Sequence, residues 1–132
     1  MKNDKTKILL VCEDGQSTLD TAAGTIQSAI NGSHEVKLRS ASKVSIQEVL
    51  AADSYLFGVG KADSAAWTEL RRLFKGINLA GRKAAFFAGD IRESATLREA
   101  FKDAGLYVNG PDLLVKKGVD VVAWVRGALT RI

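Results

Sequence analysis

The sequence predicts an α/β fold, a three-layer αβα sandwich built on a doubly wound parallel sheet. Short apolar segments alternate with segments of helical spacing along all 132 residues, which is typical of parallel strands joined by crossing helices. The first apolar segment, KILLVC, is almost unbroken, as expected for a strand buried on both faces. No repeat or linker interrupts the alternation, so residues 1–132 are expected to form a single domain.

A strand and a helix open the pattern. The strand is Lys7–Cys12. Ser17 is expected to cap the following helix, with Asp20 reaching back from the third helical position. One apolar face of this helix is formed by Leu19, Ala22, Ala23, Ile26, Ala29 and Ile30. The turn at Asn31–His34 ends it.

Two more strands flank a short helix. Glu35–Ser40 alternates in polarity, which suits a strand at the edge of the sheet. Ser45 and Glu48 have the spacing of a capping box at a helix start. Ser54–Gly60 is rich in aromatic and apolar residues and is predicted to be the third strand.

The second half repeats the alternation. A helix is expected from Asp63 or Ser64 to Gly76, and Lys83–Asp90 is predicted to be the fourth strand. The apolar face of that helix consists of Trp67, Leu70 and Phe74.

A fourth long helix, a fifth strand and a closing helix complete the pattern. The fourth helix is expected to start at Ser94 and to stop at Gly105. The fifth strand is expected within Leu106–Val115, which Asn109–Pro111 could interrupt. The apolar faces of the two helices consist of Leu97, Ala100, Phe101 and Ala104, and of Val122, Val125 and Leu129.

Composition narrows the classes of function. A lone cysteine excludes an intramolecular disulfide, and a lone histidine, His34, offers no basis for a metal site. The apolar run after the polar start is too short for a signal peptide or a membrane span, so a cytoplasmic protein without a membrane partner is expected.

The net charge of +4 is compatible with an acidic partner, although the basic residues are scattered along the chain. No nucleic-acid motif or interleaved aromatic residues accompany them, so no nucleic-acid partner is expected. A solvated helix face and a docking patch for an acidic protein are the two interpretations of the densest basic set, which comprises Arg71, Arg72, Lys75, Arg82 and Lys83.

The segment EDGQST, residues 13–18, is the candidate site. It lies between a strand and a helix N-terminus, where free backbone N–H groups and the helix dipole favour an anion. Gly15 permits close approach, and Ser17 and Thr18 offer hydroxyls. However, Glu13 and Asp14 would each oppose a singly charged phosphate at ~6 Å by roughly 2–3 kcal/mol. A capped turn that binds nothing is the alternative interpretation.

The whole chain resembles short-chain flavodoxins. The resembling segments are KILLVC with the loop and helix that follow, SIQEVLAADSYLFGVG, LAGRKAAFFAGD and VVAWVRGAL. The resemblance implies a five-stranded parallel sheet of order 2-1-3-4-5, an FMN cofactor and one-electron transfer. The FMN contacts that it implies are Asp14, Gly15, Gln16, Ser17, Thr18, Leu19, Val59, Gly60, Lys61, Gly89, Asp90 and Ile91.

Several residues depart from the family pattern. Aligned without gaps, Asp14 stands where a phosphate-binding hydroxyl is expected, and Leu19 stands in place of the last threonine. In a loop shortened by one residue, Thr18 would take that last place instead. Trp67 is the sole aromatic residue near the two flavin-stacking loops, and its spacing assigns it to the core. Lost stacking would remove about 1–3 kcal/mol per contact. FMN binding is therefore expected to be weak or absent.

The resulting hypothesis is a non-enzymatic binding or regulatory module, monomeric or weakly dimeric, with an unidentified and acidic protein partner. An FMN-dependent one-electron carrier is the alternative. A third hypothesis follows from the likeness of KILLVCEDGQST to the start of the IIB components of lactose/cellobiose phosphotransferase systems, in which Cys12 would carry a phosphoryl group cradled by Gly15, Ser17 and Thr18. The neighbouring acids oppose it, because they would keep the thiol protonated.

Overall fold

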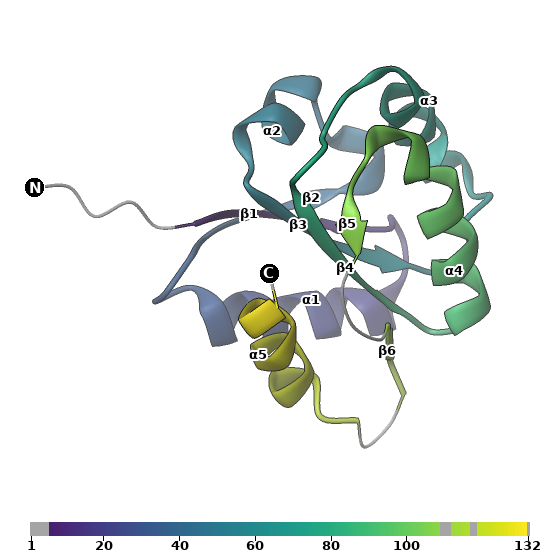
Figure 1. The fold of residues 1–132 in the computed structure, drawn as a ribbon. Helices are drawn as coiled ribbons and strands as arrows, with labels where there is room; N and C mark the ends of the chain where they lie inside the picture. Colours follow the sequence, from purple (N-terminus) through teal and green to yellow (C-terminus); the bar gives the residue numbers. More distant parts are fainter. Residues whose placement is uncertain (1–5, 109–111, 117–118, 132) are drawn as a thin grey trace, which may run out of the picture.

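The computed structural model describes residues 6–108, 112–116 and 119–131, with the backbone alone for residues 129–131. Its sheet is parallel throughout and has the order β2-β1-β3-β4-β5, which confirms the predicted topology (Figure 1). A further short strand, β6, also pairs with β4. The strands are β1 (Lys7–Cys12), β2 (Glu35–Ser40), β3 (Ser54–Val59), β4 (Lys83–Ala88), β5 (Tyr107–Val108) and β6 (Leu113–Leu114).

The predicted fifth strand consists of these two short pieces. Tyr107 of β5 is in register with Lys83 at the start of β4, and Leu113 of β6 is in register with Phe87 near its end. Both pieces therefore lie along the same side of β4. The predicted interruption at Asn109–Pro111 falls outside the described residues.

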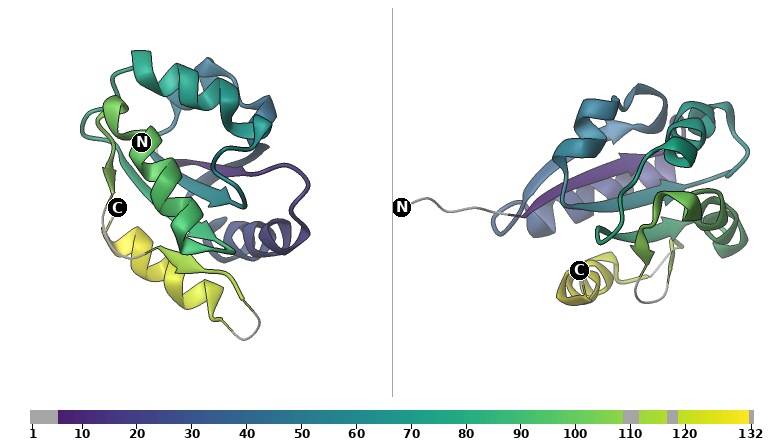
Figure 2. Two further views of the ribbon diagram at one scale, coloured as in Figure 1. Left: turned by 90° about the vertical axis from the view of Figure 1, so that its right-hand side faces the viewer. Right: turned by 45° about the horizontal axis from the view of Figure 1, so that its top comes forward.

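Helices cover both faces of the sheet (Figures 1 and 2). One face carries α1 and α5, and the other carries α2, α3 and α4, with a separate hydrophobic cluster beneath each layer. The helices are α1 (Ser17–Ile30), α2 (Ile46–Ala51), α3 (Thr68–Gly76), α4 (Ile91–Ala100) and α5 (Val121–Arg131), and the short 3₁₀ segments are η1 (Ala41–Lys43), η2 (Ala65–Trp67) and η3 (Lys102–Ala104). The predicted three-layer arrangement is confirmed.

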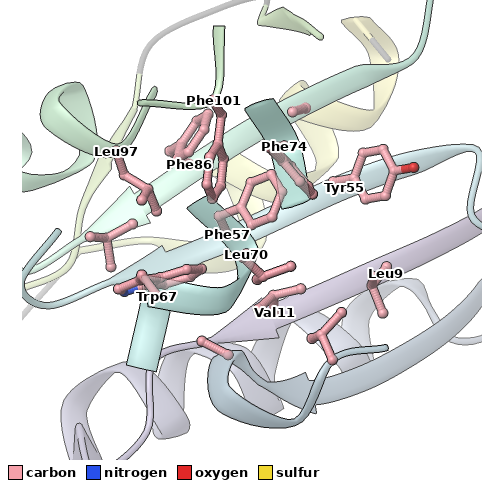
Figure 3. Packing of buried hydrophobic residues seen from close by; sticks show 14 of the residues in the cluster. Leu9, Val11, Tyr55, Phe57, Trp67, Leu70, Phe74, Phe86, Leu97 and Phe101 are labelled. Carbon is pink, nitrogen blue, oxygen red and sulfur yellow. The ribbon is translucent and has the colours of Figure 1, made fainter. Parts of the chain in front are cut away.

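An aromatic cluster fills the layer between the sheet and the helices α3 and α4 (Figure 3). Phe57 is fully buried at its centre, with ring centroids of Phe86 and Phe101 both at 5.1 Å. Trp67 and Phe74 meet Phe57 edge to face, a geometry that aromatic quadrupoles favour. The helical spacing that assigned Trp67, Leu70 and Phe74 to the core is confirmed.

The helix starts agree with the sequence at α2 and differ at α1, α3 and α4. The helix expected from Asp63 or Ser64 begins as the 3₁₀ segment η2, which Ser64 caps by accepting from Ala66 N at 3.2 Å, and α3 starts only at Thr68. At α2, Ser45 and Glu48 form the predicted capping box, because each side chain accepts a hydrogen bond from the other residue's backbone N–H. Ser17 does not cap α1: it is the first helical residue, and Gln16 holds the N-cap position without a side-chain hydrogen bond.

Ser94 does not start α4 either. Asp90 has the extended backbone that a cap requires, and its carboxylate accepts a hydrogen bond from Arg92 N at 2.9 Å. Ser94 is buried one turn later, where its hydroxyl donates to Ile91 O and to Asp112 Oδ2.

Three of the densest basic residues make contacts within the fold. Arg82 Nη1 donates to the carbonyls of Val49, Leu50 and Ala52 and to Tyr55 Oη, at 3.0–3.3 Å. Arg71 Nη1 donates to Ala62 O at 2.8 Å, and Arg72 pairs with Glu69. A guanidinium with such partners is less available to an outside partner than the sequence suggests.

No described helix is long and apolar enough to cross a membrane.

Candidate functional site

The loops after β1, β3 and β4 meet at one end of the parallel sheet (Figure 1). This end is where ligands bind in open α/β sheets. Gly15 has a φ of +75°, the left-handed conformation that glycine tolerates best. Ser17 and Thr18 are exposed at the start of α1, whereas Leu19 is buried in the core.

Glu13, in the loop after β1, is the most constrained polar residue of this end. Its side chain is 1% exposed, and its Oε1 accepts hydrogen bonds from Gly60 N at 2.8 Å, Lys61 N at 2.8 Å and Trp67 Nε1 at 2.7 Å. Among the described residues, no lysine, arginine or histidine forms an ion pair with it. Backbone and indole dipoles therefore stabilise this carboxylate.

The position of Glu13 follows from the alternation of β1. Glu13 N donates to Gly58 O at 3.0 Å, so the pairing of β1 with β3 continues one residue past Cys12. Leu9 and Val11 face the aromatic cluster, and the two-residue period places Glu13 on that same face. The two-residue period of β1 is the sequence signal that could have predicted this orientation of Glu13.

A second carboxylate binds Ala62, the residue that follows Lys61 in the loop after β3. Glu93, in the first turn of α4, accepts a hydrogen bond from Ala62 N at 2.8 Å. Ala62 O in turn accepts from Arg71 Nη1. This role of Glu93 was not predicted from the sequence. The backbone of Gly60–Ala62 is therefore held by three side chains, two of which are anionic.

The loops after β1 and β3 also approach each other closely. A Cβ atom at Gly60 would lie 2.7 Å from Gln16 Cδ and 2.9 Å from Glu13 Oε2. Only glycine therefore fits at this position without displacing a neighbour. Val59, just before it, is fully buried.

Asp14 turns away from the loop after β3. Its carboxylate accepts hydrogen bonds from Ser42 Oγ at 2.5 Å and from Ser42 N at 3.1 Å. Burial opposes ionisation of this group, but the bonds from Ser42 outweigh it and lower its pKa. Both acids that the sequence placed beside a phosphate thus have internal partners.

The loop after β4 contributes a different surface. Gly89 is exposed, and Ile91 exposes 49% of its surface at the start of α4. Hydrogen bonds from Arg92 lower the pKa of Asp90, and the two side chains form an ion pair at 2.8 Å. Lys61, from the loop after β3, is exposed. The predicted FMN contacts thus lie in the loops at one end of the sheet or at the adjoining ends of α1, β3 and α4, but Leu19 and Val59 are buried.

Several solved structures that match this architecture are flavodoxins. A flavodoxin from Streptococcus pneumoniae has a TM-score of 0.81 at 9% identity, over 96% of this chain and 100% of that one. Flavodoxin 2 from Bacillus cereus has a TM-score of 0.80 at 21% identity, again over 96% and 100%. A short-chain flavodoxin associated with a PDU bacterial microcompartment has a TM-score of 0.79 at 12% identity, over 96% and 98%.

The chain has the flavodoxin fold. The resemblance drawn from the sequence is therefore confirmed at the level of the fold. No protein-family model and no curated protein matches the sequence.

The phosphate end of an FMN site is partly present in this flavodoxin fold. Gly15, Ser17 and Thr18 are exposed beside the N-terminus of α1, where hydroxyls and backbone N–H groups suit a phosphate. Leu19, by contrast, is in the core and offers nothing to it.

The flavin end does not fit. Trp67 is fully buried, and its indole N–H is bound by Glu13. The described residues 60–64 and 89–91 include no aromatic side chain. The N–H groups of Gly60, Lys61 and Ala62 already donate to carboxylates. A flavin ring would thus meet neither an aromatic face nor free donors in the loop after β3.

Cys12 is a buried thiol at the end of β1. Its Sγ donates to Asp20 Oδ1 at 3.5 Å. Burial, then the hydrogen bond and charge of Asp20, and then the charges of Glu13 and Asp14 raise its pKa from the ordinary 9.0 to about 12. The thiolate that a phosphoryl carrier needs is therefore strongly disfavoured at neutral pH.

We expect the folded protein to resist alkylation of Cys12 by iodoacetamide at pH 8, and the urea-unfolded protein to react fully. Because folding raises this pKa, the thiol's contribution to stability is complete below about pH 9 and is lost as the pH rises towards 12. Mass spectrometry of labelled protein measures the first effect. Asp20→Asn removes the charge that bonds the thiol and should speed labelling. Fast labelling of folded wild-type protein would contradict the assignment.

Proposed function

We propose that this chain is a non-enzymatic binding or regulatory module with the flavodoxin fold, which binds FMN weakly or not at all. The observation that carries the proposal is the loop after β3, whose N–H groups at Gly60, Lys61 and Ala62 are taken by Glu13 and Glu93. Loss of two stacking contacts at about 1–3 kcal/mol each would weaken flavin binding by tenfold or more.

The deciding experiment is an absorption spectrum of the purified protein before and after incubation with excess FMN and desalting. We expect a colourless protein after desalting and a Kd for FMN of about 1 μM or weaker by fluorescence titration. A matched pair of variants tests where any residual binding occurs. Ser17→Ala with Thr18→Ala should abolish it, because both hydroxyls are lost, whereas Ser33→Ala, in the turn at the other end of α1, should leave it unchanged.

One-electron transfer through FMN is the alternative, and the likeness of fold supports it. Two solved neighbours are described as an oxidised flavodoxin and as a two-electron reduced flavodoxin. This alternative requires stoichiometric flavin after desalting, with a spectrum that dithionite bleaches reversibly. Such a result would overturn the proposed function.

The proposed activity is recognition of another protein through the loops at the carboxyl end of the sheet. Exposed Ile91 offers apolar contact area, and Lys61 offers a positive charge. An acidic partner remains part of this proposal, supported by the net charge of +4. A cytoplasmic location and a monomeric or weakly dimeric state remain predictions.

A further inference from the structure

We propose that Gly60, Lys61 and Trp67 form an oxyanion-binding niche for a carboxylate, and that Glu13 is its built-in ligand. The inference concerns the same loop as the proposed function, but it does not depend on whether the wild-type protein binds FMN. It assigns Glu13 a role in specificity: its carboxylate closes this loop to acceptor groups from outside.

The geometry of the niche is that of an anion receptor. Three N–H donors, from Gly60 N, Lys61 N and Trp67 Nε1, converge on a single oxygen, Glu13 Oε1, at 2.7–2.8 Å. Successive backbone N–H groups and a side-chain donor aimed at one oxygen constitute the arrangement that stabilises oxyanions. Bonds of this kind to a carboxylate are about twice as strong as those between neutral groups.

The niche is held open by groups other than Glu13. Glu93 and Arg71 fix Ala62, the next residue of the loop, from both its N–H and its carbonyl. The ring of Trp67 is packed against Phe57 and Phe101 at 6.3 and 6.2 Å between centroids. The donors should therefore keep their places when the carboxylate is removed.

Glu13 is expected to keep free anions out of the niche. The fold holds its carboxylate against the three donors, which gives it an effective concentration in the millimolar range or above. Its side chain is 1% exposed, so an external anion must displace it rather than add to it. We therefore expect formate not to bind the niche of the wild-type protein at concentrations that fill the niche of Glu13→Ala.

The test is chemical rescue of Glu13→Ala by sodium formate, followed in ¹⁵N NMR spectra at the N–H resonances of Gly60, Lys61 and the Trp67 indole. We expect the substitution to shift all three resonances and formate to return them saturably towards their wild-type positions. The wild type should need at least about tenfold more formate for any change. Sodium chloride at equal ionic strength should not reproduce the effect.

Asp14→Ala is the matched control, because it removes the neighbouring carboxylate, which accepts hydrogen bonds from Ser42, while leaving the niche filled. Formate should not move the three resonances in that variant. If Glu13→Ala does not fold in chloride, recovery of a folded spectrum in formate supports the niche, and failure to recover overturns it. A folded Glu13→Ala protein that shows no saturable response at the three resonances also overturns it.

These outcomes are separate from those of the FMN experiment. Retained FMN in the wild type would defeat the proposed function without altering the formate result. Failure of formate to bind Glu13→Ala would overturn the niche. It would not change the FMN result, because a colourless wild-type protein still supports the proposed function.

Discussion

Glu13→Ala is expected to lower the free energy of unfolding by about 3–5 kcal/mol in chloride buffer. Three donors lose their shared acceptor, and a buried donor left unsatisfied costs about 1–3 kcal/mol. Water that enters the space left by the Glu13 side chain would offset part of the cost of the three unsatisfied donors. The loss is a large share of the 5–15 kcal/mol that stabilises a typical domain. Urea denaturation followed by far-UV circular dichroism measures it.

Glu13→Gln separates hydrogen bonding from charge. The amide oxygen can still accept at the niche, so a smaller loss of about 1–2 kcal/mol is expected. An Ala variant as stable as the wild type would show that the contacts of Glu13 contribute no net stability.

Phe57→Ala is expected to cost about 3–5 kcal/mol, through lost burial and the cavity left behind. Phe57 is fully buried among other aromatic rings. The rings of Tyr55, Trp67, Phe74, Phe86 and Phe101 all lie within 6.3 Å of it between centroids (Figure 3). The helices α3 and α4 both pack on this cluster. The urea midpoint should fall sharply, with little change in the slope of the transition.

Tyr107→Ala is the control for an aromatic residue outside this cluster. Tyr107 exposes 55% of its surface on β5, and its removal should change stability by no more than about 0.5 kcal/mol. Equal effects of the two substitutions would show that the aromatic cluster is not the centre of the fold's stability.

Most of the fold could be predicted from sequence periodicity. The strand Lys7–Cys12 and the capping box at Ser45 and Glu48 are local features, since a buried run and a spacing of three residues define them. The starts of α1 and α4 could not be chosen correctly, because several polar residues near each start can cap a helix. Which of them caps is decided by the backbone of the preceding loop: Asp90 is extended there, and Ser94 lies inside the helix.

The candidate site was predictable in position but not in its contacts. Parallel strands bring their carboxyl ends together, so the loops around Gly15, Gly60 and Gly89 had to meet. The carboxylate of Glu13, however, binds an N–H group 47 residues further along the chain. The sequence showed two acids in a loop that suits a phosphate. Only the folded structure shows which groups each carboxylate contacts.

The uneven length of strand pairing has a consequence for hydrogen exchange. β3 pairs with β1 over five residues and with β4 over six, whereas β5 and β6 each pair with β4 over two. Fewer backbone hydrogen bonds therefore hold β5 and β6 to the sheet than hold the central strands. The amide protons of β5 and β6 are expected to exchange with solvent before those of the central strands.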